Sequence, residues 1–109
     1  MTWKLEYLSE AISDLASLDK SIRQPVIKGI KKIQKNPVSK EEGGYGTPLG
    51  NKEGNNLTGL FKIKFLKYDI RVVYKLERQD NVMKIIVISV RAENKVYDEA
   101  GNRRLKHDL

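Results

Sequence analysis

The chain has 109 residues, of which 39% are hydrophobic and 32% charged, as is typical of one soluble globular domain spanning residues 1–109. The absence of cysteine excludes disulfide bonds and thiolate chemistry, and no apolar run approaches the roughly 20 residues that cross a bilayer. The net charge of +7 lies mainly in residues 60–109, with 12 basic and 7 acidic residues, which indicates a polyanionic partner: nucleic acid, an acidic membrane surface or an acidic protein.

The first third of the chain predicts one strand and two helices. Apolar and polar residues alternate over residues 3–8, which predicts a strand; a signal peptide would need an apolar core there, so we expect a cytoplasmic protein. Ser9 is the expected cap of a first helix, whose apolar stripe covers residues 12–18. A capping-box pattern at residues 21–24 predicts that a second helix begins close to Pro25. Helices joined this briefly are expected to form an antiparallel hairpin.

The rest of the chain predicts a loop, three strands and a tail. Residues 38–56 are rich in Gly, Asn and charge, which indicates a loop. Strands are expected at residues 60–66, 70–77 and 82–90. The third of these is apolar on both faces, which is typical of a central strand. The basic tail, residues 92–109, is expected to hold one short helix around residues 96–105.

This order of elements predicts the α+β class. We expect a small sandwich in which the N-terminal strand joins a mainly antiparallel sheet and the helical hairpin packs on one sheet face. The other face is expected to stay partly open, and a functional site is expected there.

Strand alternation places cations on the face away from the helices. Lys62 and Lys64 share that face on the first of the three strands, and Arg71 takes it on the next. If the odd-numbered residues of the third strand, from Met83 to Arg91, also lie on that face, Arg91 joins the same patch. Like charges on neighbouring strands are destabilising, so such a cluster is retained most readily where an anion binds. Lys62 and Lys64 taken alone are more often a solvated strand face.

The segments LTGLFKIKF, YDIRVVYKL and MKIIVISVR resemble the RelE family of bacterial toxins, within the RelE/ParE superfamily. The resemblance covers almost the whole chain and implies a RelE-like sandwich. Its specific part is an ordered set at family-like spacing, namely Lys62, Lys64, Arg71, Arg91 and Tyr97.

The resemblance implies an endoribonuclease that cuts messenger RNA in the ribosomal A site and is bound by a cognate antitoxin. It implies a reaction without metal or other cofactor, in which the RNA 2′-hydroxyl attacks the phosphate and leaves a 2′,3′-cyclic phosphate and a 5′-hydroxyl. The sequence agrees, since it has no His/Asp/Glu cluster at metal-ligand spacing.

The residues suit this chemistry directly. Arg71 and Arg91 offer planar, permanently charged forks for the developing phosphate charge. Like charges lower the pKa of a lysine, so Lys62 or Lys64 is a candidate general base. Tyr97 would stack on a base or take part in proton transfer; a tail aromatic packed on the sheet edge is equally compatible with the sequence.

The tail offers further cations. Expected contacts to the RNA backbone come from Arg103, Arg104 and Lys106. The single histidine, His107, is expected to be a bystander.

Three alternative functions remain at this level. A ParE-like toxin would share the fold but inhibit DNA gyrase without nuclease activity, although such proteins generally lack the full cationic set. An RNA-binding module without chemistry would stack bases on sheet aromatics, which fits an open face of cations and aliphatic residues poorly. A toxin-like protein that has lost activity is also compatible with the sequence.

Overall fold

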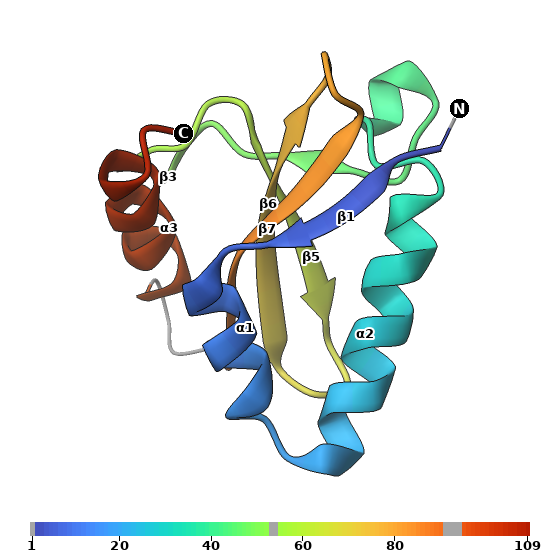
Figure 1. The fold of residues 1–109 in the computed structure, drawn as a ribbon, viewed down its shortest axis with the longest axis vertical. Helices are drawn as coiled ribbons and strands as arrows, with labels where there is room; N and C mark the ends of the chain where they lie inside the picture. The colour runs from blue at the N-terminus through green and yellow to red at the C-terminus, as the bar shows by residue number, and fades with distance from the viewer. Residues whose placement is uncertain (1, 53–54, 91–94) are drawn as a thin grey trace.

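Helices cover both faces of a five-stranded mixed sheet in the computed structural model, which describes residues 2–52, 55–90 and 95–109 (Figure 1). The helices are α1 (Ser9–Ala16), α2 (Lys20–Gln34), α3 (Lys95–Lys106) and the short 3₁₀ helix η1 (Lys40–Glu42). The strands are β1 (Lys4–Tyr7), β2 (Thr47–Pro48), β3 (Asn51–Lys52), β4 (Asn55–Asn56), β5 (Leu60–Phe65), β6 (Ile70–Glu77) and β7 (Val82–Val90). No helix among these described residues is long and apolar enough to span a bilayer.

The strand order in the sheet is β1-β7-β6-β5-β2, and β3 pairs with β4 in a separate hairpin. Only β1 and β7 pair in parallel among the described strands, so the expected α+β class with a mainly antiparallel sheet is confirmed. The strand at residues 82–90 is an interior strand, but β6 occupies the centre. The loop expected at residues 38–56 contains η1 and the short strands β2, β3 and β4.

Both predicted helix starts need correction. Helix α1 begins at Ser9 itself, with Leu8 at the cap position, and α2 begins at Lys20 after Asp19; neither described start has a side-chain cap. Pro25 is therefore the sixth residue of α2, where its missing N–H leaves one backbone hydrogen bond unmade. Arg23 strengthens the connection instead, because its guanidinium donates to carbonyl oxygens at the end of α1 and in the link.

One core lies between α1, α2 and the facing side of the sheet. Strand alternation predicts this face correctly, since Phe61 of β5 and Ile70, Val72 and Tyr74 of β6 all belong to this core. The Tyr74 ring stacks on Phe61 with 5.2 Å between centroids.

A second core lies on the opposite face, which was expected to stay open. Helix α3 covers part of it and contributes Val96, Tyr97 and Ala100, which pack with Val73 and Val87 of the sheet (Figure 1). The tail helix, predicted around residues 96–105, is confirmed, but its apolar stripe makes it a structural layer rather than a free basic tail.

A β-bulge changes the side-chain alternation of β7. The register pairs Tyr74 with Ile85 and Val73 with Val87, so Ile86 is skipped. Met83 and Ile85 consequently face the α1/α2 core, whereas Ile86 and Val87 face the α3 core. The expectation that odd-numbered residues from Met83 onward share one face is therefore wrong before the bulge, although it holds for Val87 beyond it.

Tyr74→Phe is expected to destabilise the fold. The Tyr74 hydroxyl is fully buried and donates a 2.8 Å hydrogen bond to the Pro37 carbonyl oxygen, which ties the segment after α2 to the central strand. Loss of the donor leaves a buried carbonyl unpaired, so the free energy of unfolding should fall by about 1–3 kcal/mol in urea titrations. Tyr45→Phe, at an exposed ring, is the control and should change it by less than about 0.5 kcal/mol. Equal effects of the two variants would contradict this role.

Candidate functional site

The sheet register brings three of the predicted cations together. Lys64 on β5 lies directly opposite Arg71 on β6, and Arg71 lies opposite Ser89 on β7. Residues paired in this way have Cα atoms about 4.5–5.5 Å apart. Lys62 precedes Lys64 by two positions on β5 and lies on the same face, about 7 Å from it. We call Lys62, Lys64 and Arg71 the cation cluster.

Arg91, the fourth predicted cation, lies outside the described residues. Its membership of the cluster stays a prediction.

Tyr97 lies under Arg71 rather than in solvent. The Arg71 guanidinium carbon is 5.8 Å from the centroid of the Tyr97 ring, a cation–π distance. The Tyr97 residue is only 3% exposed and belongs to the α3 core. In this arrangement the ring supports the guanidinium, and stacking on an RNA base would require the ring to be uncovered.

Arg103 is corrected from an expected RNA contact to an internal one. It is only 9% exposed, and its guanidinium donates to both carboxylate oxygens of Asp14, at 2.7 and 3.2 Å, and to Glu99 at 2.8 Å. A further donor reaches the Ile86 carbonyl oxygen at 2.8 Å. Burial lowers the pKa of Arg103, but Asp14 and Glu99 outweigh it and the pKa lies above its ordinary value. With its donors committed, Arg103 is not placed to bind phosphate.

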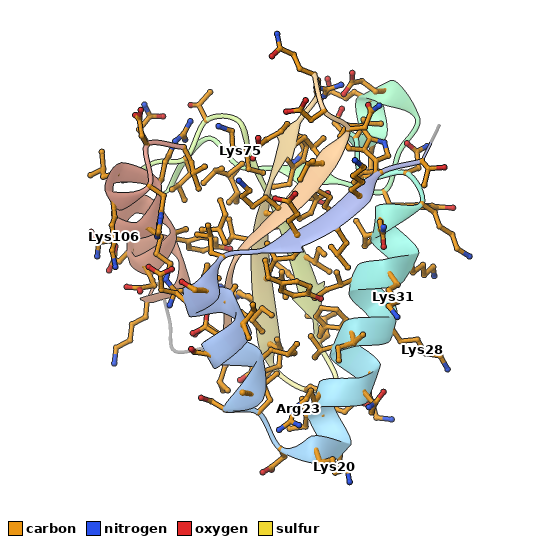
Figure 2. The ribbon with its side chains drawn as sticks, in the orientation of Figure 1. Lys20, Arg23, Lys28, Lys31, Lys75 and Lys106 are labelled. Atoms are coloured by element: carbon orange, nitrogen blue, oxygen red, sulfur yellow. The ribbon has the colours of Figure 1, made fainter. Side chains whose placement is uncertain are left out.

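Arg104 and Lys106 lie on different sides of α3. The Arg104 guanidinium donates to the backbone carbonyl of Asn56 in β4 at 3.3 Å. The exposed Lys106 ammonium donates to Glu10 of α1 at 3.1 Å and lies at the outer side of α3 (Figure 2). The two side chains therefore do not form one patch, and their expected contact with RNA stays a prediction. His107 also binds Glu10, so it serves to attach α3 to α1.

An open hollow beside the cation cluster contains residues that the sequence did not single out. Its polar and aromatic lining consists of Lys40, Tyr45, Thr47, Lys62 and Lys64. Thr47 pairs with Lys62 across β2 and β5, and the Tyr45 residue is about half exposed. A cation next to an exposed aromatic ring suits a single-stranded nucleotide. Sequence alone gave no signal for this, because it depends on β2 joining the sheet.

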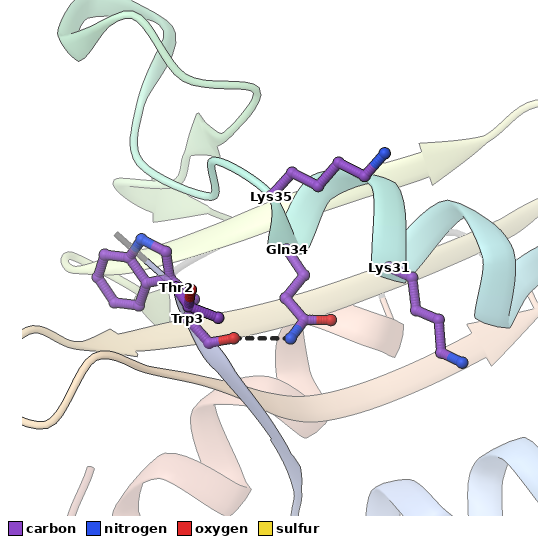
Figure 3. A pocket seen from close by; sticks show the side chains of 5 residues that line it. All are labelled: Thr2, Trp3, Lys31, Gln34 and Lys35. Atoms are coloured by element: carbon purple, nitrogen blue, oxygen red, sulfur yellow. Dashed lines mark hydrogen bonds between the residues drawn. The ribbon is translucent and has the colours of Figure 1, made fainter.

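A second pocket lies elsewhere, between the N-terminal strand and α2. It is lined by Thr2, Trp3, Lys31, Gln34 and Lys35, and the Gln34 amide donates to the Trp3 carbonyl oxygen at 2.7 Å (Figure 3). Figure 2 shows Lys28 on the outer side of α2, directed away from the sheet, and Lys31 on the next turn of the same helix. This basic helix surface is separate from the cation cluster.

Within the described part of the chain, no group of acidic or histidine side chains has an arrangement that could hold a metal ion.

Comparison with solved structures identifies the fold. A double mutant of the Escherichia coli RelE toxin in the free state superposes with a TM-score of 0.74 over 100% of both chains, at 20% identity. The chain has the RelE fold. A chain of the intact E. coli RelBE toxin-antitoxin complex matches with a TM-score of 0.65 at 16% identity, over 84% of this chain and 100% of that one.

This chain also matches a chain of the toxin-antitoxin complex RelBE2 from Mycobacterium tuberculosis. The TM-score is 0.60 at 21% identity, over 84% of this chain and 100% of that chain. No protein-family model and no curated protein sequence matches. At these identities the likeness concerns the fold, so the roles of individual residues must be argued from this chain's own geometry.

Glu10→Gln is expected to lose less stability in acid than the wild type does. Hydrogen bonds from His107, the backbone and Lys106 hold the pKa of Glu10 far below its ordinary value of 4.5. A carboxyl whose pKa is lower in the folded state stabilises the fold above its unfolded pKa and loses this contribution as the pH falls. The unfolding free energy of the variant should therefore decrease less steeply than that of the wild type between about pH 6 and about pH 3.

Glu41→Gln in η1 is the matched control, because Glu41 is exposed and η1 lies on the opposite side of the molecule from α3 (Figure 1). Its unfolding free energy should fall with pH as steeply as that of the wild type. If the unfolding free energies of Glu10→Gln and the wild type fall equally steeply in acid, Glu10 does not hold α3 through an ionised pair.

Proposed function

We propose that this protein is the toxin of a type II toxin-antitoxin pair and acts as a ribosome-dependent endoribonuclease that cuts messenger RNA and inhibits translation. The observation that carries the proposal is the cation cluster, in which Lys62, Lys64 and Arg71 gather on one face of a RelE-fold sheet. Like charges so placed cost stability, so an anion that binds there in use gives the arrangement a physical reason.

The proposed reaction is an in-line displacement at a phosphodiester. The RNA 2′-oxygen bonds to phosphorus while the bond to the 5′-oxygen breaks, which leaves a 2′,3′-cyclic phosphate and a 5′-hydroxyl. Negative charge grows on the phosphoryl oxygens, and the Arg71 fork is suited to bind two of them. Lys62 or Lys64 takes the 2′-proton, and a second group of the site protonates the leaving 5′-oxygen. Protein cations supply the charge stabilisation, so the proposal uses no metal or other cofactor.

Dependence on the ribosome follows from the composition of the cluster. The cation cluster contains neither a histidine nor a carboxylate, which are the usual general bases. Such a site relies more strongly on an external scaffold to hold the 2′-hydroxyl in line with the leaving oxygen. We therefore propose the messenger in the ribosomal A site as substrate, with only weak cleavage of free RNA.

The second proposed partner is a cognate antitoxin. Structural neighbours of this chain include toxin-antitoxin complexes from E. coli and M. tuberculosis. An antitoxin is expected to keep the toxin inactive in the cytoplasm until it is removed. The net charge of +7 favours both an acidic protein segment and RNA.

Arg71→Ala is expected to reduce A-site cleavage by on the order of 10² to 10³-fold, as is typical of losing a group that binds transition-state charge. The measurement is primer extension on a messenger held in programmed ribosomes. Lys28→Ala, which removes an exposed cation on the outer side of α2, is the matched control and should cut at the wild-type rate. Arg91→Ala in the same assay tests whether the fourth predicted cation acts with the cluster.

Two results would contradict the proposal. A folded wild-type protein that makes no cut in programmed ribosomes is not this nuclease. Cleavage reduced equally by Arg71→Ala and Lys28→Ala would show that the cation cluster does not perform the chemistry.

A further inference from the structure

The side chains of Asp14 and Arg103 bind the backbone of β7 just past the end of its neighbouring strand, β1. β1 pairs with β7 only as far as Tyr7 and Ile85, and the β-bulge at Ile86 follows immediately. Past this point the Ile86 carbonyl oxygen accepts from Arg103 at 2.8 Å, and the Ile88 amide donates to Asp14 at 3.0 Å. Asp14 and Arg103 thus form hydrogen bonds with backbone groups that would otherwise pair with a neighbouring strand.

The same two side chains bind each other. Arg103 and Asp14 form a two-pronged ion pair, at 2.7 and 3.2 Å, and the Arg103 residue is only 9% exposed. Since Asp14 belongs to α1 and Arg103 to α3, the pair joins these helices to β7 at one point. We call this arrangement the clasp.

The clasp holds both elements that flank Arg71. Tyr97 lies six residues before Arg103 on α3, and its ring carries the Arg71 guanidinium at 5.8 Å. Ser89, which lies opposite Arg71, follows the clasped Ile88 directly along β7. A shift of α3 or of the register of β7 would therefore move the support beneath Arg71.

We infer that Asp14 and Arg103 are positioning residues, which hold Tyr97 and the end of β7 in place so that the Arg71 guanidinium points at the phosphate. The expected effect on cleavage rests on the proposed function. The expected effect on the contact between Arg71 and Tyr97 does not depend on it. In this account neither Asp14 nor Arg103 touches RNA. Their effect on cleavage passes through Arg71, which acts on the phosphate directly.

Arg103→Lys is the sharpest substitution for the test. Lysine keeps the charge and can reach Asp14, but it lacks the planar fork that binds Asp14 and the Ile86 carbonyl oxygen at once. The fold should therefore survive while α3 loosens. Asp14→Asn is the second, milder variant, because its amide oxygen can still accept from the Ile88 amide or from Arg103.

The geometric readout is the side-chain Nε–Hε NMR signal of Arg71, assigned by its loss in Arg71→Lys. With the guanidinium 5.8 Å from the ring centroid, the Tyr97 ring current is expected to displace this signal in the wild type, and Tyr97→Leu should give the undisplaced position. Arg103→Lys should move the signal most of the way to that position, and Asp14→Asn part of the way. Glu10→Gln, which breaks a different contact between α1 and α3, should leave the signal unchanged.

The kinetic readout is the single-turnover cleavage rate in programmed ribosomes. Arg103→Lys should lower the rate by about 10 to 100-fold, because small displacements of a catalytic group are costly, while the protein concentration for half-maximal cleavage stays unchanged. Glu10→Gln should cut at the wild-type rate.

Separate outcomes decide the inference and the proposed function. An Arg71 signal that keeps its wild-type position in Arg103→Lys overturns the inference. So does a signal that moves towards the Tyr97→Leu position while cleavage stays at the wild-type rate. A wild type that cuts nothing overturns the proposed function, and the NMR signal then still decides whether the clasp positions Arg71.

Discussion

The ion pair between Asp14 and Arg103 is the contact on which the second layer of the fold depends. It fixes α3 to α1 and to the bulged part of β7, and the apolar residues of α3 then close the core on that sheet face. Without it, α3 would rely on a short apolar stripe, on the hydrogen bond from Arg104 to Asn56 and on the contacts of Glu10 with Lys106 and His107. A buried ion pair adds little net stability over an apolar pair of the same shape, so its value here lies in specifying where the helix docks.

The cation cluster is the second constraint, and it opposes stability. Lys64 and Arg71 face each other across β5 and β6, and Lys62 extends the positive charge towards β2. Tyr97 offsets part of the repulsion at Arg71 through the electron-rich face of its ring. A layer added for packing thus also supports a charged residue of the candidate site, which links the docking of α3 to the proposed chemistry.

Local patterns predicted those features that depend on alternation along a strand. The inward positions of Phe61 and Val72, and with them the shared face of Lys62 and Arg71, follow from a period of two that β5 and β6 keep throughout. The bulge at Ile86 lies in a run apolar on both faces, where polarity gives no signal of a parity change. Arg103 and Arg104 are adjacent and identical in the sequence, and only the docking of α3 beside Asp14 makes one internal and leaves the other on the surface.

In the proposed function, the scissile phosphate of a messenger binds the cation cluster. The most direct test is a cryo-electron microscopy structure of the protein on ribosomes whose messenger carries a 2′-O-methyl group at the nucleotide to be attacked, which blocks cleavage. We expect a phosphate oxygen within about 3 Å of the Arg71 guanidinium, with Lys62 and Lys64 on the same side of the messenger. A bound messenger that passes over another surface, with Arg71 far from any phosphate, would contradict it.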